Sequence, residues 1–430
     1  MKYYSTNKNA PEVDFREASI NGLAPDRGLY FPSSIPKVDP YLIENIKSYS
    51  NLDLAFNIIK PYVGTAIPDN ELLRILAETI SFEIPLVTIN ERISSLELYH
   101  GPTFAFKDIG ARFMSRCLGY FAEGISTKMT VLVATSGDTG GAVANGFYNV
   151  PGVDVVILYP SGRVSDIQEK QLTTLGGNVT ALEVLGTFDD CQKMVKEAFA
   201  DTTLRSKLFL TSANSINVAR WIPQQLFYFF AAKQREDDFA PAVAVPSGNF
   251  GNICSGLLAK KSGLPLGKFI AACNANQAVP SYLKTGKYIP QPTISTISNA
   301  MDVGDPSNFV RIIELYKSSY QDICNDIVGY SISDSETKST IEATFKKFGY
   351  WLDPHGAVAF AALESYLAEH KDEKGILLET AHPIKFDCET TASGAITDSI
   401  AQNVEMLRKK EKKSLLVKSS YNELKDYLLQ

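Results

Sequence analysis

Apolar residues recur at helical spacing in the first part of this chain. Tyr41–Tyr49 and Asn70–Ile80 both show the spacing of an amphipathic helix. Asp39-Pro40 and Pro68-Asp69 precede these segments and are typical helix starts. The pattern predicts a separate, mostly helical N-terminal domain over residues 1–80.

From about residue 96 onward, short apolar runs rich in β-branched residues alternate with helical stretches. The predicted strands are Met129–Ala134, Val153–Leu158, Asn178–Leu185, Ala242–Val245, Lys268–Ala272 and Gly375–Glu379. The predicted helices are Gly141–Phe147, Val164–Thr174, Asp189–Phe199 and Ile253–Lys261, and Ser165 with Gln168 forms a capping-box signature before the second of them. This alternation predicts an α/β fold with a doubly wound parallel sheet in two lobes. Since ligands bind at the carboxyl ends of such strands, we expect the chemistry in the loops that follow them.

We assign the rest of the chain to two further units. Residues 81–390 form the predicted two-lobed domain, and residues 391–430 form a C-terminal helical tail. Within the two-lobed domain, Gly286–Asp305 is rich in Pro, Thr, Ser and Asn and is predicted to be a long loop. The basic cluster Arg408–Lys413 is interpreted as a solvated helix face.

The composition narrows the possible partners. The chain has 430 residues, of which 45% are hydrophobic and 21% charged, and this is typical of a globular protein with two or three folded units. Its net charge is -6, whereas binding to nucleic acid or to an anionic membrane surface requires a basic excess. We therefore expect a small-molecule substrate rather than nucleic acid or a membrane.

The sequence predicts neither a metal site nor export. The six cysteines have the spacing of reduced, mostly buried thiols, with no C-x-x-C pair among positions 117, 191, 254, 273, 324 and 388. The four histidines lack metal-ligand spacing. The N-terminal residues show no basic-then-apolar signal, and no apolar run approaches ~18 residues. The cytoplasm is therefore the expected location.

The run from His100 to Asp108, His-Gly-Pro-Thr-Phe-Ala-Phe-Lys-Asp, is the most informative stretch. It sets Lys107 between aromatic and small apolar residues, after a Gly-Pro turn and at the predicted start of a helix. Partial burial disfavours the ammonium form and lowers the pKa of a lysine. Such a lysine is the usual nucleophile for imine chemistry, although the pattern also fits an amphipathic lysine whose head reaches water.

Two strand-to-helix loops are polar and rich in glycine. Thr135–Gly141 follows the first predicted strand, and Pro246–Asn252 follows the strand that begins at Ala242. Glycine lets the backbone approach a ligand closely, and free N–H groups at a helix N-terminus bind anions. The second loop has the make-up of a phosphate cup, and the first that of a carboxylate or phosphate site. Each also fits an ordinary tight turn capped by Ser or Asn.

The common nucleotide-binding and esterase motifs do not occur in the chain. It contains no G-x-G-x-x-G fingerprint, no G-x-x-x-x-G-K-[ST] P-loop and no G-x-S-x-G elbow. What remains is a lysine suited to imine formation and two candidate anion-binding loops on an open α/β sheet. Pyridoxal phosphate, an aldehyde that carries a phosphate, fits that combination.

Two further stretches are unusually polar. Thr211–Asn217 has five hydrogen-bonding side chains in seven positions, with Arg220 about one helical turn further on. The alternative for this stretch is a helix N-cap with Arg220 on a solvated face. Glu379–Phe386 follows the last predicted strand, so Thr380 falls at a carboxyl edge of the sheet, and His382 fits either a functional or a structural role. Asp353–Gly356 is interpreted as a helix start.

With these residues in hand, the chain resembles the threonine synthase family, in the microbial branch that carries a helical N-terminal extension. The resemblance runs from the first residues to about residue 390. It rests on Asn21–Leu23, Gly28–Pro32, His100–Asp108, Ala134–Gly140, Ser212–Asn217, Pro246–Gly251, Ser298–Val303 and Thr380–Pro383. This family is similar to the tryptophan-synthase β type of pyridoxal-phosphate enzymes. The resemblance therefore implies that the two-lobed domain is catalytic and surrounds the cofactor.

The resemblance also implies roles for single residues. It makes Lys107 the Schiff-base lysine and Thr380 the partner of the cofactor's ring nitrogen. The phosphate of the cofactor then belongs to Gly248, Asn249, Phe250, Gly251 and Asn252. We assign the substrate carboxylate to Ser136, Gly137, Asp138 and Thr139, and the substrate phosphate to Asn214, Asn217 and Arg220. Related enzymes often carry Asn in place of Asp138, so the protonation of the cofactor's ring hydroxyl stays open.

The implied reaction converts O-phospho-L-homoserine and water to L-threonine and phosphate, by γ-elimination and β-addition of water, in the last step of threonine biosynthesis. One alternative is another pyridoxal-phosphate lyase, such as a serine/threonine dehydratase. The third polar stretch and the N-terminal unit argue against it. The other alternative is a catalytically silent ligand-binding homologue, against which the intact Lys107 argues.

Overall fold

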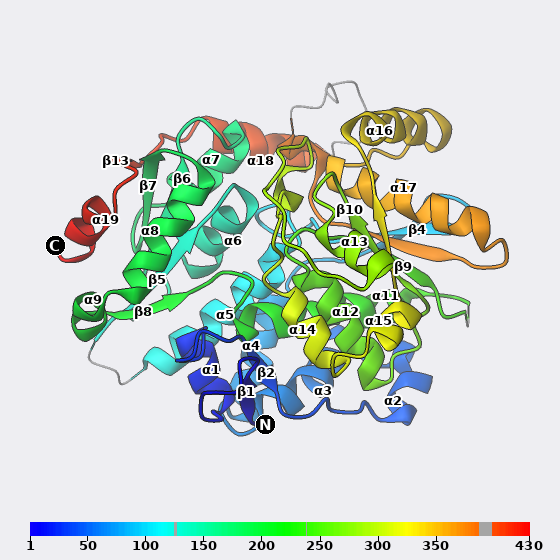
Figure 1. Ribbon diagram of the computed structural model, residues 1–430, viewed down its shortest axis with the longest axis horizontal. Helices are drawn as coiled ribbons and strands as arrows, with labels where there is room; N and C mark the ends of the chain where they lie inside the picture. The colour runs from blue at the N-terminus through cyan, green and yellow to red at the C-terminus, as the bar shows by residue number, and fades with distance from the viewer. Residues whose placement is uncertain (124–126, 238, 387–397) are drawn as a thin grey trace.

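The computed structural model describes residues 1–123, 127–237, 239–386 and 398–430 (Figure 1). Two large sheets stand apart in this view, each with helices beside it, and the N-terminal segment lies along the lower edge. All strand pairs in these two sheets are parallel except one. The predicted α/β class with two lobes is thus confirmed. Cys388 and the boundary predicted between residues 390 and 391 lie outside the described residues.

The first lobe is built on a five-stranded sheet with the order β13-β7-β6-β5-β8. Its strands are β5 (Met129–Ala134), β6 (Val153–Pro160), β7 (Val179–Leu185), β8 (Phe209–Ser212) and β13 (Leu415–Lys418). Its helices are α6 (Asp138–Phe147), α7 (Asp166–Thr173), α8 (Phe188–Ala200) and α9 (Thr202–Lys207). β5 has its predicted bounds, and every residue in it is buried, as in a parallel sheet covered on both faces. Ser165 and Gln168 form the predicted capping box of α7.

The second lobe is built on a six-stranded sheet with the order β11-β10-β9-β12-β4-β3. Its strands are β3 (Leu86–Thr88), β4 (Ile93–Glu97), β9 (Ala242–Pro246), β10 (Phe269–Cys273), β11 (Ile327–Ser331) and β12 (Gly375–Glu379), and only β3 runs antiparallel to its neighbour. Its helices are α13 (Ala278–Thr285), η3 (Asn299–Met301), α14 (Phe309–Leu315), α15 (Tyr320–Asp326), α16 (Asp334–Phe348), α17 (Pro354–Glu369) and η4 (Pro383–Lys385). The predicted strands match β9, β10 and β12, and Asp353 caps α17 as predicted. Apart from η3, Gly286–Asp305 has the predicted irregular structure.

A third group of helices lies between the two sheets in Figure 1. It consists of α5 (Lys107–Ala122), α10 (Val218–Trp221), η2 (Ile222–Gln225), α11 (Leu226–Gln234) and α12 (Gly251–Ser262). α5 packs against α6 of the first lobe and against α10 and η2, while α12 packs against η2 and α14 of the second lobe. Since α5 begins at Lys107 and α12 at Gly251, two of the predicted site segments open helices of this central group.

The N-terminal segment is mostly helical, as predicted. It contains β1 (Tyr3–Ser5), α1 (Phe15–Asn21), β2 (Tyr30–Pro32), α2 (Pro40–Glu44), η1 (Ile46–Ser48), α3 (Asn51–Val63) and α4 (Asp69–Thr79). Its apolar side chains share one core with the central helices, and the rings of Phe15 and Phe113 lie 6.3 Å apart. The division at residue 80 therefore stays a prediction, since no break in the core marks it.

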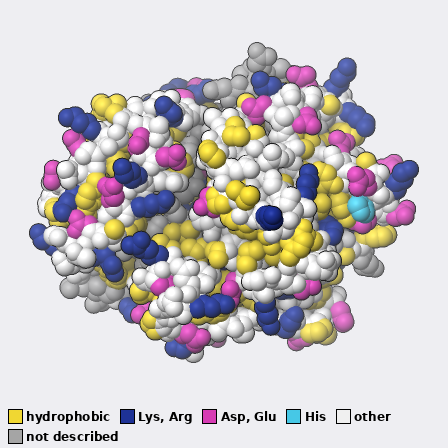
Figure 2. Space-filling model, in the orientation of Figure 1, with side chains coloured by type: hydrophobic (Ala, Val, Ile, Leu, Met, Phe, Trp, Pro, Cys, Tyr) yellow, Lys and Arg dark blue, Asp and Glu magenta, His cyan; other side chains and the backbone are white. Residues whose placement is uncertain are grey.

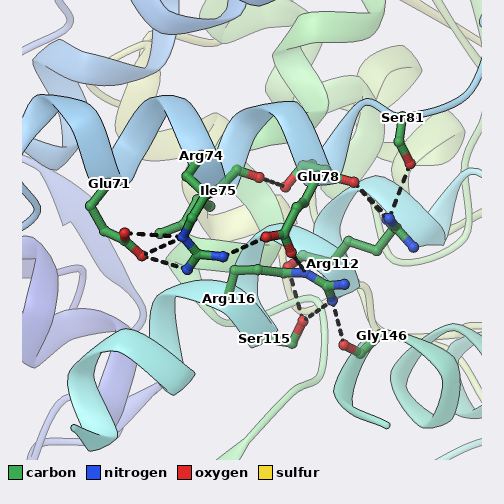
Figure 3. A network of polar contacts seen from close by, with 10 residues as sticks. Glu71, Arg74, Ile75, Glu78, Ser81, Arg112, Ser115, Arg116 and Gly146 are labelled. Carbon is green, nitrogen blue, oxygen red and sulfur yellow. Dashed lines mark hydrogen bonds and ion pairs between the residues drawn. The ribbon is translucent and has the colours of Figure 1, made fainter. Parts of the chain in front are cut away.

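A network of charged side chains also joins this segment to α5 and α6 (Figure 3). Glu78 of α4 forms ion pairs with Arg74 on its own helix and with Arg116 of α5. Arg116 donates onward to the carbonyl of Gly146 in α6 at 2.6 Å, and Arg112 donates to the carbonyl of Glu78, also at 2.6 Å. The body of α5 is therefore held from the N-terminal segment, while its first residue points to the site.

The C-terminal segment differs from the predicted helical tail. α18 (Asp398–Arg408) and α19 (Tyr421–Leu428) are helices, but β13 lies between them and pairs with β7, because Leu415 to Val417 is an apolar run suited to a sheet edge. The interpretation of Arg408–Lys413 as a helix face was wrong. α18 ends at Arg408, and Lys412 forms ion pairs with Glu169 and Glu183, both at 2.7 Å.

The surface carries charges of both signs. On the face drawn in Figure 2, basic and acidic side chains are interspersed, as the small net charge predicts. Within the described ranges, no helix combines the length and the apolar character needed to cross a membrane. Four of the cysteines are free and fully buried, namely Cys117, Cys191, Cys254 and Cys273.

Candidate active site

The Lys107 segment lies against the segment that follows β12. Ala105 and Ala381 form an antiparallel bridge, and the Phe106 N–H donates to the Thr380 carbonyl at 2.9 Å. The turn before Lys107 is fixed by Asp108, whose carboxylate accepts from the Thr103 N–H at 2.9 Å and from its hydroxyl at 2.6 Å. Two predicted site segments, far apart in sequence, are thus brought together, with Lys107 beside Thr380.

The surroundings of Lys107 favour its neutral amine. Its side chain is only 17% exposed. The Phe106 ring, whose centre lies 5.0 Å from Nζ, acts in the other direction, because an aromatic face attracts a cation. Burial lowers the pKa of Lys107, the charges of Lys385 and Arg220 lower it further, and Asp138 opposes them. Lys107 is also the first residue of α5, where the helix dipole disfavours a positive charge. The prediction of a buried lysine with a lowered pKa agrees with this geometry.

Asp138, at the start of α6, faces two lysines. Its Oδ1 lies 2.6 Å from Nζ of Lys385 and its Oδ2 lies 3.6 Å from Nζ of Lys107. Gln168, which also forms the capping box of α7, donates to Oδ1 at 3.0 Å. The charge of Lys385 and the hydrogen bonds keep the pKa of the Asp138 carboxyl below its usual range, in spite of its burial. A carboxylate cannot bind a second carboxylate, so only the backbone N–H of Asp138 suits the predicted role toward the substrate.

The loop around Asp138 is fixed by hydrogen bonds to the Thr135 side chain. The Thr135 hydroxyl accepts from the N–H groups of Gly137 at 3.0 Å and Gly140 at 2.8 Å. Gly137 has φ 147°, and a Cβ at this position would lie 2.6 Å from the side chain of Gln168. Only glycine fits there, and the turn leaves Ser136 and Thr139 on either side of Asp138, at the N-terminus of a ten-residue helix.

The predicted phosphate cup follows β9 and opens α12. Phe250 is buried with φ 59°, a left-handed conformation that is strained for a bulky residue and is found mainly where surrounding structure enforces it. Gly248 packs so closely that a Cβ would lie 2.6 Å from Cα of Met301. Asn249 ties the cup to the third polar stretch, because its Nδ2 donates to the Ser215 hydroxyl at 2.6 Å.

Asn252 shows that this cup suits an anion. Its side chain is 6% exposed, and its Oδ1 accepts from the Tyr228 hydroxyl at 2.9 Å. Its Nδ2 is buried and has no hydrogen-bond partner. An unpaired buried amide donor costs on the order of 1–3 kcal/mol, and a phosphate oxygen at the N-terminus of α12 would remove that cost. The residues of the cup thus fit the phosphate of pyridoxal phosphate.

The third polar stretch, after β8, contains a buried arginine. Arg220 is 2% exposed, donates from Nη1 to the Ala213 carbonyl, and leaves its buried Nε without a partner. It lies against Gly110 of α5, where a Cβ would come within 3.1 Å of that Nε. Burial lowers the pKa of Arg220 to about 10, and the charge of Asp108 opposes the shift. The alternative of an Arg220 on a solvated face is excluded, because all four residues of α10 are buried.

The asparagines of this stretch differ in their freedom to bind a ligand. Asn217 caps α10 with its Oδ1, and its Nδ2 donates to the carbonyls of Ser19 and Ser212, so its amide is committed to backbone partners. Asn214 is partly exposed, and its Oδ1 has no partner. Since an amide oxygen only accepts hydrogen bonds, the free Oδ1 does not itself suit a phosphate, and a contact from Asn214 would have to come from its Nδ2. The geometry therefore supports Arg220, whose buried Nε is an unpaired donor, more directly than either asparagine.

His382 has a structural hydrogen bond within this site. Its Nδ1 accepts from the Ile384 N–H at 3.1 Å, and its ring packs edge-on against Tyr99 at 5.0 Å. Burial, reinforced by His100, lowers the pKa of His382 to about 4, although Glu97 and Asp353 act in the opposite direction. His382 is therefore neutral near pH 7, and its Nδ1 accepts from the Ile384 N–H in the turn that leads to Lys385.

Sequence reasoning missed two buried cations. Lys385 lies in the polar stretch after β12, and its position at the same sheet edge as Thr380 was the available signal. Arg311 of α14 is fully buried, donates to the carbonyls of Tyr30 and Ile216 at 3.0 and 2.6 Å, and stacks on Trp221. It links the N-terminal segment to the third polar stretch. Nothing in the local sequence marks it, because its neighbours read as an ordinary amphipathic helix.

Comparison with known proteins agrees with this geometry. The family signature described as Pyridoxal-phosphate dependent enzyme matches residues 91–379, and that described as Threonine synthase N terminus matches residues 2–80. The threonine synthase of Haemophilus influenzae is 43% identical over 388 residues, covering 90% of this chain and 89% of that protein. The threonine synthase of Saccharomyces cerevisiae is 37% identical over 448 residues, covering 89% and 87%.

Solved structures give the same result. The crystal structure of threonine synthase from Escherichia coli matches with a TM-score of 0.90 at 37% identity and covers 100% of this chain and 99% of its own. The structure of PLP-bound threonine synthase from Brucella melitensis matches with a TM-score of 0.91 at 32% identity, covering 100% and 98%. The predicted family, lyase activity and cofactor are thereby confirmed. The chain belongs to the threonine synthase family of pyridoxal-phosphate dependent enzymes.

Proposed function

We propose that this chain converts O-phospho-L-homoserine and water to L-threonine and phosphate, in the last step of threonine biosynthesis. This reaction must hold one amine-reactive aldehyde, two phosphates and one carboxylate. The observation that carries the proposal is the joining of three polar loops around one partly buried lysine. Lys107 contacts Asp138 of the first loop, Arg220 packs on the helix that Lys107 opens, and Asn249 binds Ser215 between the other two.

The chain's own residues fit the cofactor in three places. Lys107 would hold the aldehyde, the backbone of Gly248 to Asn252 with Asn252 Nδ2 would hold the phosphate, and Thr380 would meet the ring nitrogen. When bound, pyridoxal phosphate supplies an electron sink for the negative charge left on carbon as protons leave. Lys107, as a neutral amine beside the bound substrate, would be the base that takes and returns those protons.

The substrate's two anionic groups go to the remaining loops in this proposal. The N–H groups of Ser136, Gly137, Asp138 and Thr139 open α6 and receive the carboxylate. Arg220 receives the departing phosphate with Asn214, while Asn217 holds the loop in shape. An arginine suits this task because charge-assisted Arg–phosphate bonds are the stronger kind. The buried Nε without a partner supports it.

Turnover of O-phospho-L-homoserine tests the proposal. The wild-type protein should release phosphate and form an equal amount of L-threonine. Lys107→Ala should abolish both, and Lys107→Arg should fail as well, because a guanidinium stays protonated and cannot form an imine. The matched control is Lys128→Ala, which removes a lysine that is 68% exposed and precedes β5, at the opposite end of that strand from the Thr135 loop. It should keep wild-type activity.

Two results would assign the chain to one of the alternatives. If purified protein with bound cofactor converts L-serine or L-threonine to an oxo acid and ammonia and leaves O-phospho-L-homoserine intact, the chain is a dehydratase. If it binds cofactor and turns over none of these substrates, it is a silent homologue. Full activity of Lys107→Ala would remove the catalytic assignment of this lysine.

A further inference from the structure

Lys385 is a fully buried charged group in the site. Its side chain has 0% exposure, and its Nζ contacts Asp138 Oδ1 at 2.6 Å and the Thr103 carbonyl at 2.8 Å. Thr103 belongs to the turn before Lys107, and Asp138 opens the first anion loop. A buried ammonium is costly unless it is paired and hydrogen-bonded. Lys385 is both paired and hydrogen-bonded. Its partner Thr103 precedes Lys107 in the same turn, and its partner Asp138 also contacts Lys107.

The Asp138 carboxylate is divided unequally between the two lysines. Lys385 holds one oxygen at 2.6 Å, and Gln168 donates to the same oxygen at 3.0 Å. Lys107 lies 3.6 Å from the other oxygen, beyond an ordinary hydrogen bond. One negative charge therefore faces two amines, and the amine that is closer and less exposed is Lys385.

Other charges around Lys107 do not replace this pairing. Arg220 on α10 adds a second positive charge, and Asp108 on α5 spends its carboxylate on Thr103. Among the described residues, Asp138 is the one acid in an ion pair with Lys107. If Lys385 were uncharged, Asp138 would have Lys107 as its nearest cation and would hold it as an ammonium.

We propose that Lys385 is a positioning residue that draws the Asp138 carboxylate away from Lys107 and so leaves the Lys107 amine free of its proton. This inference rests on the proposed function, since it concerns the nucleophile of that reaction. Its test does not use the substrate. A failed test would therefore leave the reaction assignment standing, and failed turnover would leave this inference standing.

The experiment measures the protonation of Lys107 in the full-length protein after removal of the cofactor. The protein is labelled with a limiting amount of acetic anhydride over a range of pH, and acetylation of Lys107 is quantified by peptide mass spectrometry. Labelling requires the neutral amine, so its midpoint reports the pKa of Lys107. The variants are Lys385→Met, Asp138→Asn and the double variant, with Lys412→Met as control. Lys412 is also an ion-paired lysine, but its partners Glu169 and Glu183 lie outside the site.

Lys385→Met should raise the midpoint by about one pH unit or more, because a nearby opposite charge shifts a pKa by ~1–3 units. At a fixed pH below the midpoint, labelling should then fall about tenfold. The double variant should return to the wild-type midpoint or below, since the acid that would hold the proton is also gone. Lys385→Arg, which keeps the charge, should stay closer to wild type than Lys385→Met. Lys412→Met should change nothing.

A purely structural role for Lys385 predicts a different pattern. Loss of packing alone would change labelling in Lys385→Met and leave it changed in the double variant. An unchanged or lowered midpoint in a folded Lys385→Met protein, or a double variant that stays shifted, would overturn the inference. If Lys385→Met does not fold, the comparison of Lys385→Arg with Asp138→Asn decides the question. The inference requires a small shift of the labelling midpoint in Lys385→Arg. It requires a lower midpoint in Asp138→Asn, because this change removes the one acid paired with Lys107.

Discussion

Two regions of this molecule place one acidic side chain between two basic side chains. One of the two regions is partly exposed, and the other is buried. In Figure 3, Glu78 lies between Arg74 and Arg116, with side-chain exposures of 40, 51 and 20%. In the site, Asp138 lies between Lys107 and Lys385, with exposures of 3, 17 and 0%. Each trio has one negative and two positive charges, and in Figure 3 Arg74 has a second acidic partner, Glu71. Only the second arrangement alters the chemistry of a member, because water screens the first.

The energies of the two regions differ for the same reason. An exposed ion pair contributes about 0–1 kcal/mol, whereas breaking a buried pair costs ~3–5 kcal/mol because one charge is left unpaired. The Glu78 network joins α4 to α5 and should tolerate change. In the Asp138 network the charges are buried, and burial together with the charge of Lys385 lowers the pKa of Lys107, while Asp138 opposes the shift. Predictions that perturb buried polar groups should therefore give large effects, and those that perturb the Figure 3 network should give small ones.

The largest expected effect is the loss of folding stability in acid that the protonation of His382 causes. Its pKa is lowered to about 4 by burial, and an unfolded histidine has a pKa of ~6.5. The unfolded chain therefore binds more protons between these values, so the contribution of His382 is full above about pH 6.5 and is lost as the pH falls toward 4. The loss is on the order of 3 kcal/mol. Thermal unfolding followed between pH 7 and 4 measures it.

His382→Asn is the matching variant for this measurement. An asparagine keeps an acceptor for the Ile384 N–H and does not titrate in this range. The variant should lose less stability than wild type over the same pH interval. An equal acid dependence in both proteins would mean that other groups account for it.

Next in size is the effect of filling the phosphate cup at Gly248. A Cβ there would lie 2.6 Å from Met301 Cα and 3.0 Å from the Ala300 carbonyl oxygen, and backbone atoms cannot move aside as side chains can. Gly248→Val should weaken cofactor binding about a hundredfold, or ~2.7 kcal/mol. The measurement is the dissociation constant of pyridoxal phosphate.

Gly251 provides the control for that measurement. A Cβ at this position would meet Asn308 Nδ2 at 3.4 Å, an ordinary contact. Gly251→Ala should therefore bind the cofactor within a few-fold of wild type. The sequence assigns both glycines to the cofactor phosphate, and the structure shows that a Cβ would clash with the backbone only at Gly248. Equal losses in the two variants would point to backbone freedom rather than steric space as the common cause.

The third effect concerns the substrate phosphate. Arg220→Met removes the guanidinium and keeps much of the buried volume. Since Arg–phosphate contacts contribute ~1.5–3 kcal/mol, kcat/KM for O-phospho-L-homoserine should fall roughly ten- to a hundredfold. The visible absorption of the bound cofactor should stay, since its phosphate belongs to another loop. Arg116→Met, from the exposed network, should leave kcat/KM nearly unchanged. Loss of the cofactor absorption in Arg220→Met would mean that the two phosphate sites are exchanged.

Patterns within one short segment were predictable from sequence. The bounds of β5 and β12, the capping box of α7 and the setting of Lys107 depend on neighbouring residues, and the structure agrees with each of them. The strands β4, β8 and β11 were missed. They are only four or five residues long, and polar or glycine positions interrupt their apolar pattern. The parallel sheets supply their pairing from elsewhere in the chain.

Relations between distant segments were not predictable in this way. Lys385 and Asp138 are 247 positions apart, and nothing in either segment shows that the two side chains meet. Arg311 and Tyr30 meet in the same manner across most of the chain. Asn217 shows the opposite case. Its polar neighbourhood predicts a ligand contact, which stays a prediction, and its amide donates to the backbone of Ser19 and Ser212. Side-chain chemistry alone cannot separate a binding residue from a capping residue.

The smallest effect should come from Glu78→Gln in the Figure 3 network. The change removes the charge between Arg74 and Arg116, and it keeps the Glu78 carbonyl that accepts from Arg112 at 2.6 Å. Since these side chains are partly exposed, the loss should be about 0.2–1 kcal/mol and should shrink as salt is added. For a protein of 430 residues it amounts to a melting temperature lowered by roughly 0.2–1 °C. Thermal unfolding at low and high salt measures it, with kcat/KM expected at the wild-type value. A large loss of activity would show that the N-terminal segment positions Lys107 through α5, and the two regions would then be coupled rather than merely alike.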